Sequence, residues 1–520
     1  MKNLKIFTLL LVSACITFSC DEEDKLINEI LVNNPIPPSP VPPTGTAGDL
    51  DLSTYVSLGA SITAGVGDGT LYDLSQAYSF PALLADRFAL EGVGGGVFNQ
   101  PTINSADGYT GTDGTTIFGK LILDLDANND GELGDAAIVP STSGDIPAAY
   151  EGDKATLNNF GVGGIQTAQI LTPLTGGPDA EANTAYNPYY ARFASEPGVS
   201  TILGDAMARN PTFFTLFPGG NDVLGYAVSG GTKDALLTDP ALVAGYIGNI
   251  LDGLMSKGAK GIIMNVPNVA VLPHFQAVPR IIEVPEASRE ELLAGIGQIN
   301  AAITGWNAAV AGSGMERPML STDMDNYPLL IEDESLSDAA VPNPAGGDDI
   351  VIPKIRNIVG TPIAALGGLT ELVLLPALPG VSSGEIGISP LAPLEDELVL
   401  DATELGTMLP NLIAINTAIG TEATTRAGSL MYMDVNTLLT EIATGGGYSS
   451  AETGGYKLSP DFTPNGMFAN DGVHLNPRGA AIMANEIIKK MNSAVADGGY
   501  GTGIPLHSDV MQFPGSTFQQ

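Results

Sequence analysis

The sequence of 520 residues is poor in basic residues, in histidine and in cysteine. Its 21 Lys and Arg residues stand against 58 Asp and Glu residues, which gives a formal net charge of −37. A surface with this charge repels phosphate backbones and anionic headgroups, so we expect no nucleic acid among its partners. The acidic excess is typical of the solubilising exterior of an exported protein.

Only two cysteines occur, Cys15 and Cys20, and both lie near the N-terminus. Two lysines precede an apolar run at residues 6–18 that is too short to span a bilayer. Cys15 lies within this run, and Cys20 follows its end. The small Ser19 before Cys20 and the acidic residues after it resemble the export signal of a bacterial lipoprotein. We therefore predict a signal peptide at residues 1–20 with lipid on Cys20, and Cys15 is the alternative acceptor. After cleavage at Cys20 no thiol would remain for a disulfide, so the fold must depend on its core.

No later apolar stretch is long enough to predict a transmembrane helix. The least polar one, Ile358 to Leu375, is interrupted by proline, glycine and Glu371. The Pro-rich segment within residues 21–47 favours extended polyproline II and is expected to act as a semi-rigid linker. These features predict an exported lipoprotein of the outer membrane or cell surface, which contacts the membrane through its lipid.

The remaining chain reads as one large domain at residues 48–498 with a C-terminal tail at 499–520. Five short apolar runs end abruptly at turns, as parallel strands buried on both faces do. The runs are Tyr55–Leu58, Leu157–Val162, Thr212–Phe217, Gly261–Val266 and Leu430–Val435. Helical patterns lie between them, and capping boxes at Ser288/Glu291 and Asp401/Glu404 predict two helix starts. A third helix is predicted to begin near Pro477. This alternation predicts an α/β fold, a three-layer α/β/α sandwich of the flavodoxin-like kind around a five-stranded, mainly parallel sheet.

Four short segments, far apart in the sequence, carry residues suited to nucleophilic catalysis. They are Gly59-Ala60-Ser61-Ile62-Thr63, Asn159-Phe160-Gly161-Val162-Gly163-Gly164, Gly219-Gly220-Asn221-Asp222 and Asp471-Gly472-Val473-His474. Together they supply a serine, two oxyanion donors, and a base with a carboxylate to orient it, which is the set that ester hydrolysis requires. Three of the segments follow predicted strands, where ligands of open α/β sheets bind.

These segments resemble the four signature blocks of the SGNH (GDSL-type) hydrolase superfamily. The resemblance implies that Ser61 is the nucleophile, His474 its base and Asp471 the residue that orients the base. It also implies an oxyanion hole formed by the Ser61 N–H, Gly164 and the Asn221 side chain. Gly161 is an alternative to Gly164 in that role, and Asp222 is expected to give structural support.

One position departs from the family pattern, because Ala60 stands where the family usually has aspartate. The other histidines, His274 and His507, lack an aspartate three residues earlier, so neither is assigned to catalysis. His274 could line the pocket or serve the structure alone.

The function implied is a serine ester hydrolase, either a lipase or acylhydrolase or a carbohydrate-type esterase, that acts through an acyl-enzyme and requires no cofactor. Lipid, glycan and small-molecule esters all fit the motifs. The alternatives are a non-catalytic binding or assembly lipoprotein with the same fold, and a thioesterase or acyltransferase.

The chain is longer than the minimal members of this family, and the extra length lies in large insertions near residues 82–157 and 275–430. Their apolar part at residues 340–400 could form a lid or a packed accessory layer.

A separate acidic segment spaces its oxygen ligands as a calcium loop does. From Asp126, oxygen ligands fall at the first, third and fifth positions with glycine at the sixth. The candidate ligands are Asp126, Asn128, Asp130 and Asp135. The twelfth position is Ala137 rather than glutamate, so a solvated acidic loop is the alternative to a structural calcium site.

Overall fold

Five short strands form the central sheet in the computed structural model, which describes residues 43–124, 137–343, 346–364, 368–463, 465–494, 498–515 and 518–519. The strands are β1 (Tyr55–Gly59), β6 (Asn159–Gly161), β7 (Phe213–Phe217), β8 (Lys260–Met264) and β17 (Leu430–Met433). Every pairing between them is parallel. Almost all of their residues are buried, which explains why each strand is a continuous apolar run. The predicted five-stranded parallel sheet is confirmed.

The order of the strands across the sheet is β17-β8-β7-β1-β6. The chain passes from β1 outward to β6, returns across β1 to β7, and then continues through β8 to β17. The direction of winding therefore reverses between β1 and β7. In open α/β sheets, ligands bind beyond the carboxyl ends of the strands at such a reversal.

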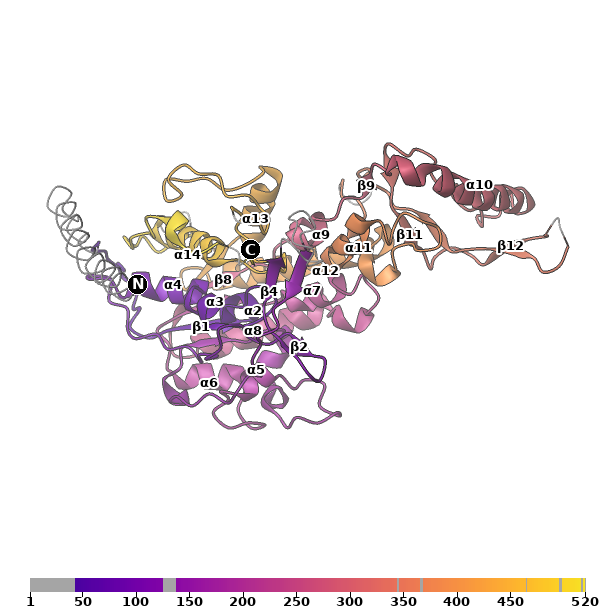
Figure 1. The fold of residues 1–520 in the computed structure, drawn as a ribbon. Helices are drawn as coiled ribbons and strands as arrows, with labels where there is room; N and C mark the ends of the chain where they lie inside the picture. Colours follow the sequence, from indigo (N-terminus) through magenta and orange to yellow (C-terminus); the bar gives the residue numbers. More distant parts are fainter. Residues whose placement is uncertain are drawn as a thin grey trace, which may run out of the picture. The chain divides into compact units, whose positions relative to one another are not determined.

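Helices cover both faces of the sheet, as Figure 1 shows. On one face α4 (Phe80–Phe88) packs against α14 (Pro477–Asn492). On the other, α8 (Pro240–Met255) packs against α6 (Ile202–Ala208) and α12 (Ala402–Thr425). The domain is therefore the three-layer α/β/α sandwich that the sequence predicts.

Two of the three predicted helix starts agree with the structure, and one does not. Asp401 caps α12 through a complete capping box with Glu404, and α14 begins at Pro477. The capping box predicted at Ser288 is wrong, since the N-cap of α10 (Glu286–Ala309) is Pro285, three residues earlier. Glu286 places a negative charge in the first turn, where the helix dipole favours it.

The insertion before β17 builds an apolar core of its own. Here α10 packs on the hairpin of β12 (Ala339–Val341) and β13 (Ile350–Ile352), and its Ile296 and Ile303 are buried. The other elements of this region are η5 (Val269–Val271), α9 (Pro273–Gln276), β9 (Ile281–Ile282), β10 (Tyr327–Pro328), β11 (Leu330–Glu332), β14 (Ile355–Asn357), β15 (Leu372–Val373), η7 (Leu375–Ala377), α11 (Leu378–Ser383), η8 (Asp396–Leu398) and β16 (Val399–Leu400).

The insertion between β1 and β6 contains two small hairpins, β2 (Gly111–Thr112) with β3 (Ile117–Phe118) and β4 (Leu121–Asp124) with β5 (Ala137–Pro140). The remaining elements are short or flank the sheet. They are α2 (Ser61–Ala64), α3 (Asp73–Ala77), η1 (Lys154–Thr156), η2 (Thr167–Ile170), η3 (Pro173–Gly176), α5 (Pro188–Ala191), α7 (Asn221–Ala227), η4 (Asp234–Leu236), α13 (Val435–Thr444), η10 (Val510–Gln512) and β18 (Phe518–Gln519).

Residues 499–515, predicted as a tail, pack against the main core. Ile504 and Val510 are buried there, and the ring of His507 is also buried, with Nε2 3.0 Å from the carbonyl oxygen of Leu83. Burial lowers the pKa of His507 to about 4, so its ring is neutral in the folded protein.

Residues 44–520 form one compact unit. Before this unit, only Pro43 is described. Within the described ranges, no helix combines the length and the apolar character needed to cross a membrane. The predicted lipid acceptors, Cys20 and Cys15, lie outside the described residues.

Candidate active site

Ser61 lies just beyond the carboxyl end of β1, where it is the first residue of α2. The first N–H groups of a helix have no partner within it, so the Ser61 N–H is not used by the helix. Gly59 allows this turn to be tight. A Cβ at that position would lie 2.2 Å from Oγ1 of Thr63 and 2.8 Å from the carbonyl oxygen of Phe217.

The register of the sheet aligns the ends of β1, β6 and β7, the three strands that lead into the first three motifs. Gly59 pairs with Gly161 of β6 on one side and with Phe217 of β7 on the other. Ser61, Gly164 and Asn221 each follow one of these paired positions by a few residues. Because the three strands are parallel neighbours, the three motifs leave the sheet at the same edge.

The two predicted oxyanion segments are joined by a direct hydrogen bond. Asn221 begins α7, and its Nδ2 donates to the carbonyl oxygen of Ile165 at 2.9 Å. A primary amide has two N–H bonds, so this contact fixes the side chain and leaves a second donor. The adjacent Gly164 is exposed with φ of 78°, a backbone conformation that favours glycine.

Gly161, the alternative oxyanion residue, has a different environment. A Cβ on Gly161 would lie 2.3 Å from the backbone nitrogen of Ala64. Its lack of a side chain therefore allows β6 to pack closely on α2. This geometry favours Gly164 over Gly161 as a donor to a ligand.

Asp222 links the loop after Gly164 to the loop before Asn221 through hydrogen bonds. It is fully buried, and its Oδ2 accepts hydrogen bonds from the backbone N–H of Thr167 at 3.0 Å and from its hydroxyl at 2.6 Å. The Thr167 hydroxyl oxygen in turn accepts from the N–H of Gly219 at 3.0 Å. The structural role expected for Asp222 agrees with these contacts.

Asp471 and His474 form a short turn before α14. Oδ2 of Asp471 is 2.7 Å from Nδ1 of His474, and Oδ1 accepts from the backbone N–H groups of Val473 and His474 at 2.8 Å each. Burial alone would raise the pKa of Asp471, but His474 and these N–H groups hold it well below its usual range. The ionised carboxylate only accepts hydrogen bonds, so Nδ1 of His474 carries a proton, and in the neutral form of the ring Nε2 is the acceptor. Nε2 is buried and has no hydrogen-bond partner within the described residues.

The loop after Ser61 holds this turn in place, a role that the sequence analysis missed. The N–H of Gly69 donates to Oδ2 of Asp471 at 2.6 Å, and Oδ1 of Asp68 accepts from the N–H of Asn470 at 2.8 Å. Asp68 is buried, and its backbone has φ of 50°. The glycine-rich run at residues 65–69 indicates a tight turn, but no local signal identifies a partner 402 residues away.

His274 contacts the same turn from α9. Its Nδ1 is 3.0 Å from the carbonyl oxygen of Asp471, and its backbone N–H donates to the carbonyl oxygen of Gly472, also at 3.0 Å. Gly472 must be glycine here, because its φ is 69° and a Cβ would lie 2.6 Å from the nitrogen of His274. Burial lowers the pKa of His274 and keeps its ring neutral. The ring therefore donates from Nδ1 to the Asp471 carbonyl.

A small cavity of about 60 Å³ adjoins this site. Ser61 and Asn221 line it together with Val473 of the Asp471–His474 turn. All four predicted segments thus lie in one region. The strand register and the hydrogen bond from Asn221 to Ile165 bring the first three together. The Asp471–His474 turn joins them through the cavity and through the hydrogen bond from Gly69 to Asp471.

A comparison with models of known protein families and a search of curated proteins found no match to this chain. The evidence for the site is therefore its own geometry and chemistry.

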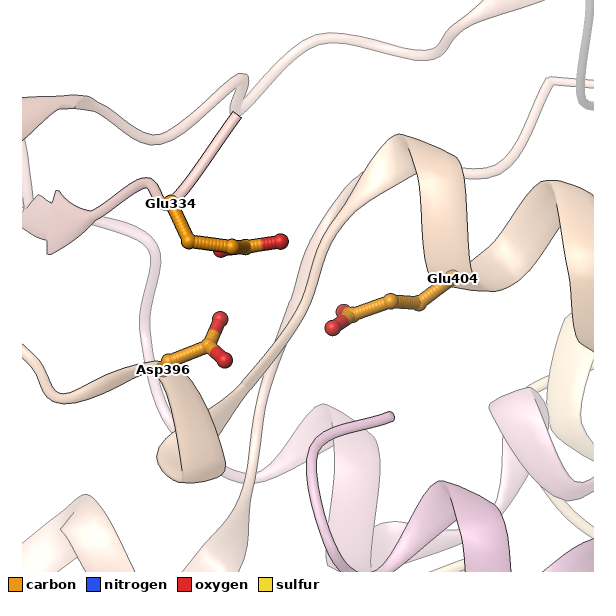
Figure 2. A group of neighbouring side chains, drawn as sticks. All are labelled: Glu334, Asp396 and Glu404. Carbon is orange, nitrogen blue, oxygen red and sulfur yellow. The ribbon is translucent and has the colours of Figure 1, made fainter. Parts of the chain in front are cut away.

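A metal could be held elsewhere by three carboxylates, those of Glu334, Asp396 and Glu404, whose ligand atoms lie within 4.8 Å of one another. Figure 2 shows that the three side chains point toward one another from separate segments. An acidic cluster alone does not define a metal site, and we assign none. The calcium ligands predicted from sequence, Asp126, Asn128, Asp130 and Asp135, lie outside the described residues.

Proposed function

We propose that this chain is a serine ester hydrolase of the SGNH type that acts through an acyl-enzyme. Ser61 is the nucleophile, His474 the general base and Asp471 the residue that fixes the tautomer of His474. The Ser61 N–H, the Gly164 N–H and the Asn221 amide stabilise the oxyanion.

The chemistry begins when Oγ of Ser61 attacks the carbonyl carbon of the ester and its proton moves to Nε2 of His474. The resulting oxyanion accepts hydrogen bonds from the three donors. The bond to the alcohol oxygen then breaks, and His474 protonates the departing alkoxide. Water attacks the acyl-enzyme and gives a proton to His474, which returns it to Ser61 as the carboxylic acid leaves.

One observation carries this proposal: the Asp471–His474 pair has the hydrogen bonds and the tautomer that a serine hydrolase needs. The 2.7 Å contact to an ionised carboxylate leaves Nε2 free of competing partners within the described chain. The strand register that brings Ser61 level with Asn221 supports it independently. In unliganded hydrolases the contact between nucleophile and base is often long and tightens when substrate binds.

The test is hydrolysis of p-nitrophenyl esters by the full chain in mild detergent, compared with Ser61→Ala. Ser382→Ala, on the exposed surface of α11, is a matched control for the loss of a serine hydroxyl. We expect Ser61→Ala to lower kcat by about 10³-fold or more, while Ser382→Ala leaves it unchanged. A fluorophosphonate should label the unmodified chain and not Ser61→Ala.

Absence of Ser61-dependent turnover, together with absence of labelling, would contradict the proposal. That result would favour a non-catalytic binding lipoprotein. If labelling occurs and thioesters are hydrolysed faster than oxygen esters, the same acyl-enzyme serves a thioesterase. If transfer of the acyl group to an added alcohol or thiol is faster than hydrolysis, it serves an acyltransferase.

A further inference from the structure

The cavity beside Ser61 is narrow and apolar, and its walls come from the ends of the strands and from two C-terminal helices. From this we infer that the preferred substrates are esters of short, uncharged acyl chains of no more than about six carbons. The inference rests on the proposed function and specifies its substrate class.

The walls of the cavity are side chains of the folded core. On the strand side they include Phe217 and Val266, and on the helix side Leu439 of α13 and Met483 of α14. Each of these four side chains is less than a tenth exposed. Buried core side chains are closely packed and yield little, so the cavity cannot widen freely around a longer chain.

The volume sets an upper limit on the occupant. A cavity measured in this way needs at least about 10–15 Å³ to hold a single water molecule. At about 60 Å³, this cavity exceeds that minimum only four- to six-fold, so it admits a small group of heavy atoms and no long chain. Acyl chains from acetyl to about hexanoyl fit this limit, whereas dodecanoyl and palmitoyl chains do not.

The lining also selects against charge, because none of the described residues that line the cavity is acidic or basic. Polar groups come from the residues that hold the reacting carbonyl, such as Ser61 and Asn221, and from Thr63. Ala60 lines the cavity as well and adds an uncharged side chain to its wall.

A second cavity offers the main alternative for a longer chain. It has a volume of about 390 Å³ and adjoins His274 and Asp471, with apolar walls that include Leu121, Leu375 and Phe462. If long acyl chains bind there instead, the enzyme would prefer them, and the inference would fail while the proposed function stood.

The experiment measures kcat/KM of the full chain in mild detergent for p-nitrophenyl esters from acetate to palmitate. We expect the maximum at six carbons or fewer and at least about a ten-fold lower value at twelve carbons and beyond. Leu439→Ala should move the maximum to a longer chain, and Leu439→Phe should move it toward acetate. Leu438→Ala, a neighbour on α13 that does not line the cavity, is the control.

The outcomes separate the inference from the proposed function. Ser61-dependent turnover with a maximum at eight carbons or more overturns the short-chain inference alone. Loss of all Ser61-dependent turnover and labelling overturns both. If the enzyme does not accept the p-nitrophenyl leaving group, chain-length preference is measured instead from the rates of labelling by alkyl fluorophosphonates with short and long chains. Faster labelling by the short chain supports the inference, and faster labelling by the long chain contradicts it. If Leu439→Ala fails to fold, Val269→Ala, at another residue that lines the cavity, provides a smaller enlargement and should shift the maximum in the same direction.

Discussion

Two buried carboxylates of this protein, Asp471 and Glu404, lie in surroundings that favour opposite charge states. At the Asp471–His474 turn, a single carboxylate receives three backbone N–H groups and a ring N–H, and its pKa falls below the usual range. At the acidic cluster of Glu334, Asp396 and Glu404, carboxylates face one another, and the pKa of Glu404 rises to about 8.

The difference lies in the donors that the fold supplies. Burial raises the pKa of Glu404, and the charges of neighbouring carboxylates add to this effect. Burial together with Glu334 raises the pKa of Asp396 to about 7. None of the three carboxylates of the cluster takes part in an ion pair with a described residue, although the adjacent Arg356 pairs with Asp333, Glu371 and Asp401. Burial alone therefore does not set the charge of a carboxylate; the hydrogen-bond donors around it decide whether it ionises.

The strongest test of this comparison is Asp471→Asn, which keeps the shape of the side chain and removes its charge. An asparagine amide facing His474 would donate to Nδ1 and force the proton onto Nε2, the wrong tautomer for a base. We expect kcat to fall by about 10³- to 10⁴-fold with little change in KM. Steady-state kinetics measures this, and thermal unfolding confirms that the variant is folded. Activity within ten-fold of the unmodified chain would show that Asp471 does not orient the base.

A smaller effect is expected from His274, which donates to the Asp471 carbonyl through Nδ1. Nδ2 of asparagine can occupy the position of Nδ1, whereas the amide of glutamine reaches the position of Nε2. We therefore expect His274→Asn to keep kcat within about three-fold, while His274→Gln and His274→Leu lose about ten-fold or more through misplacement of the turn.

Rescue by asparagine but not glutamine identifies the Nδ1 hydrogen bond as the positioning contact. Equal activity of the asparagine and glutamine variants would instead mean that this hydrogen bond does not position Asp471.

The smallest expected effect comes from Glu404 in the acidic cluster, and it changes the stability of the folded protein rather than its activity. Glu404 has an ordinary pKa of 4.5 and a folded pKa of about 8, so the folded state keeps a proton that the unfolded chain releases. Its contribution to stability is present below pH 4.5 and is lost as the pH rises toward 8, by at most about 1.4 kcal/mol per pH unit.

Glu404→Gln imitates the protonated form and removes this loss. We expect its Tm to match that of the unmodified chain at pH 4.5 and to exceed it at pH 8, by on the order of 2 °C. Differential scanning calorimetry at both pH values measures the shift. A variant less stable than the unmodified chain at pH 8 would show that the ionised carboxylate has a compensating partner.

The parts of the fold that follow from local pattern were predicted well. Each strand of the sheet is buried on both faces, so its sequence is a short apolar run that stops at a turn. Asp401 and Glu404 indicated the start of α12 because a capping box lies within four residues. The start of α10 was misplaced because Ser288 and Glu291 fit the same pattern inside a helix that already begins at Glu286.

Local pattern along the chain indicates which residues are chemically suited to the site, since the candidate nucleophile, the amide and the Asp–His spacing are features of four short motifs. The contacts that support these residues follow from tertiary packing. Gly69 and His274 meet Asp471 from 402 and 197 residues away, and the Glu404 cluster joins three separate segments. Contacts of this kind depend on how distant segments pack, and no periodicity or spacing along the chain encodes them. The pKa of each buried carboxylate depends on the same contacts, which is why Asp471 and Glu404 differ although both are acidic and buried.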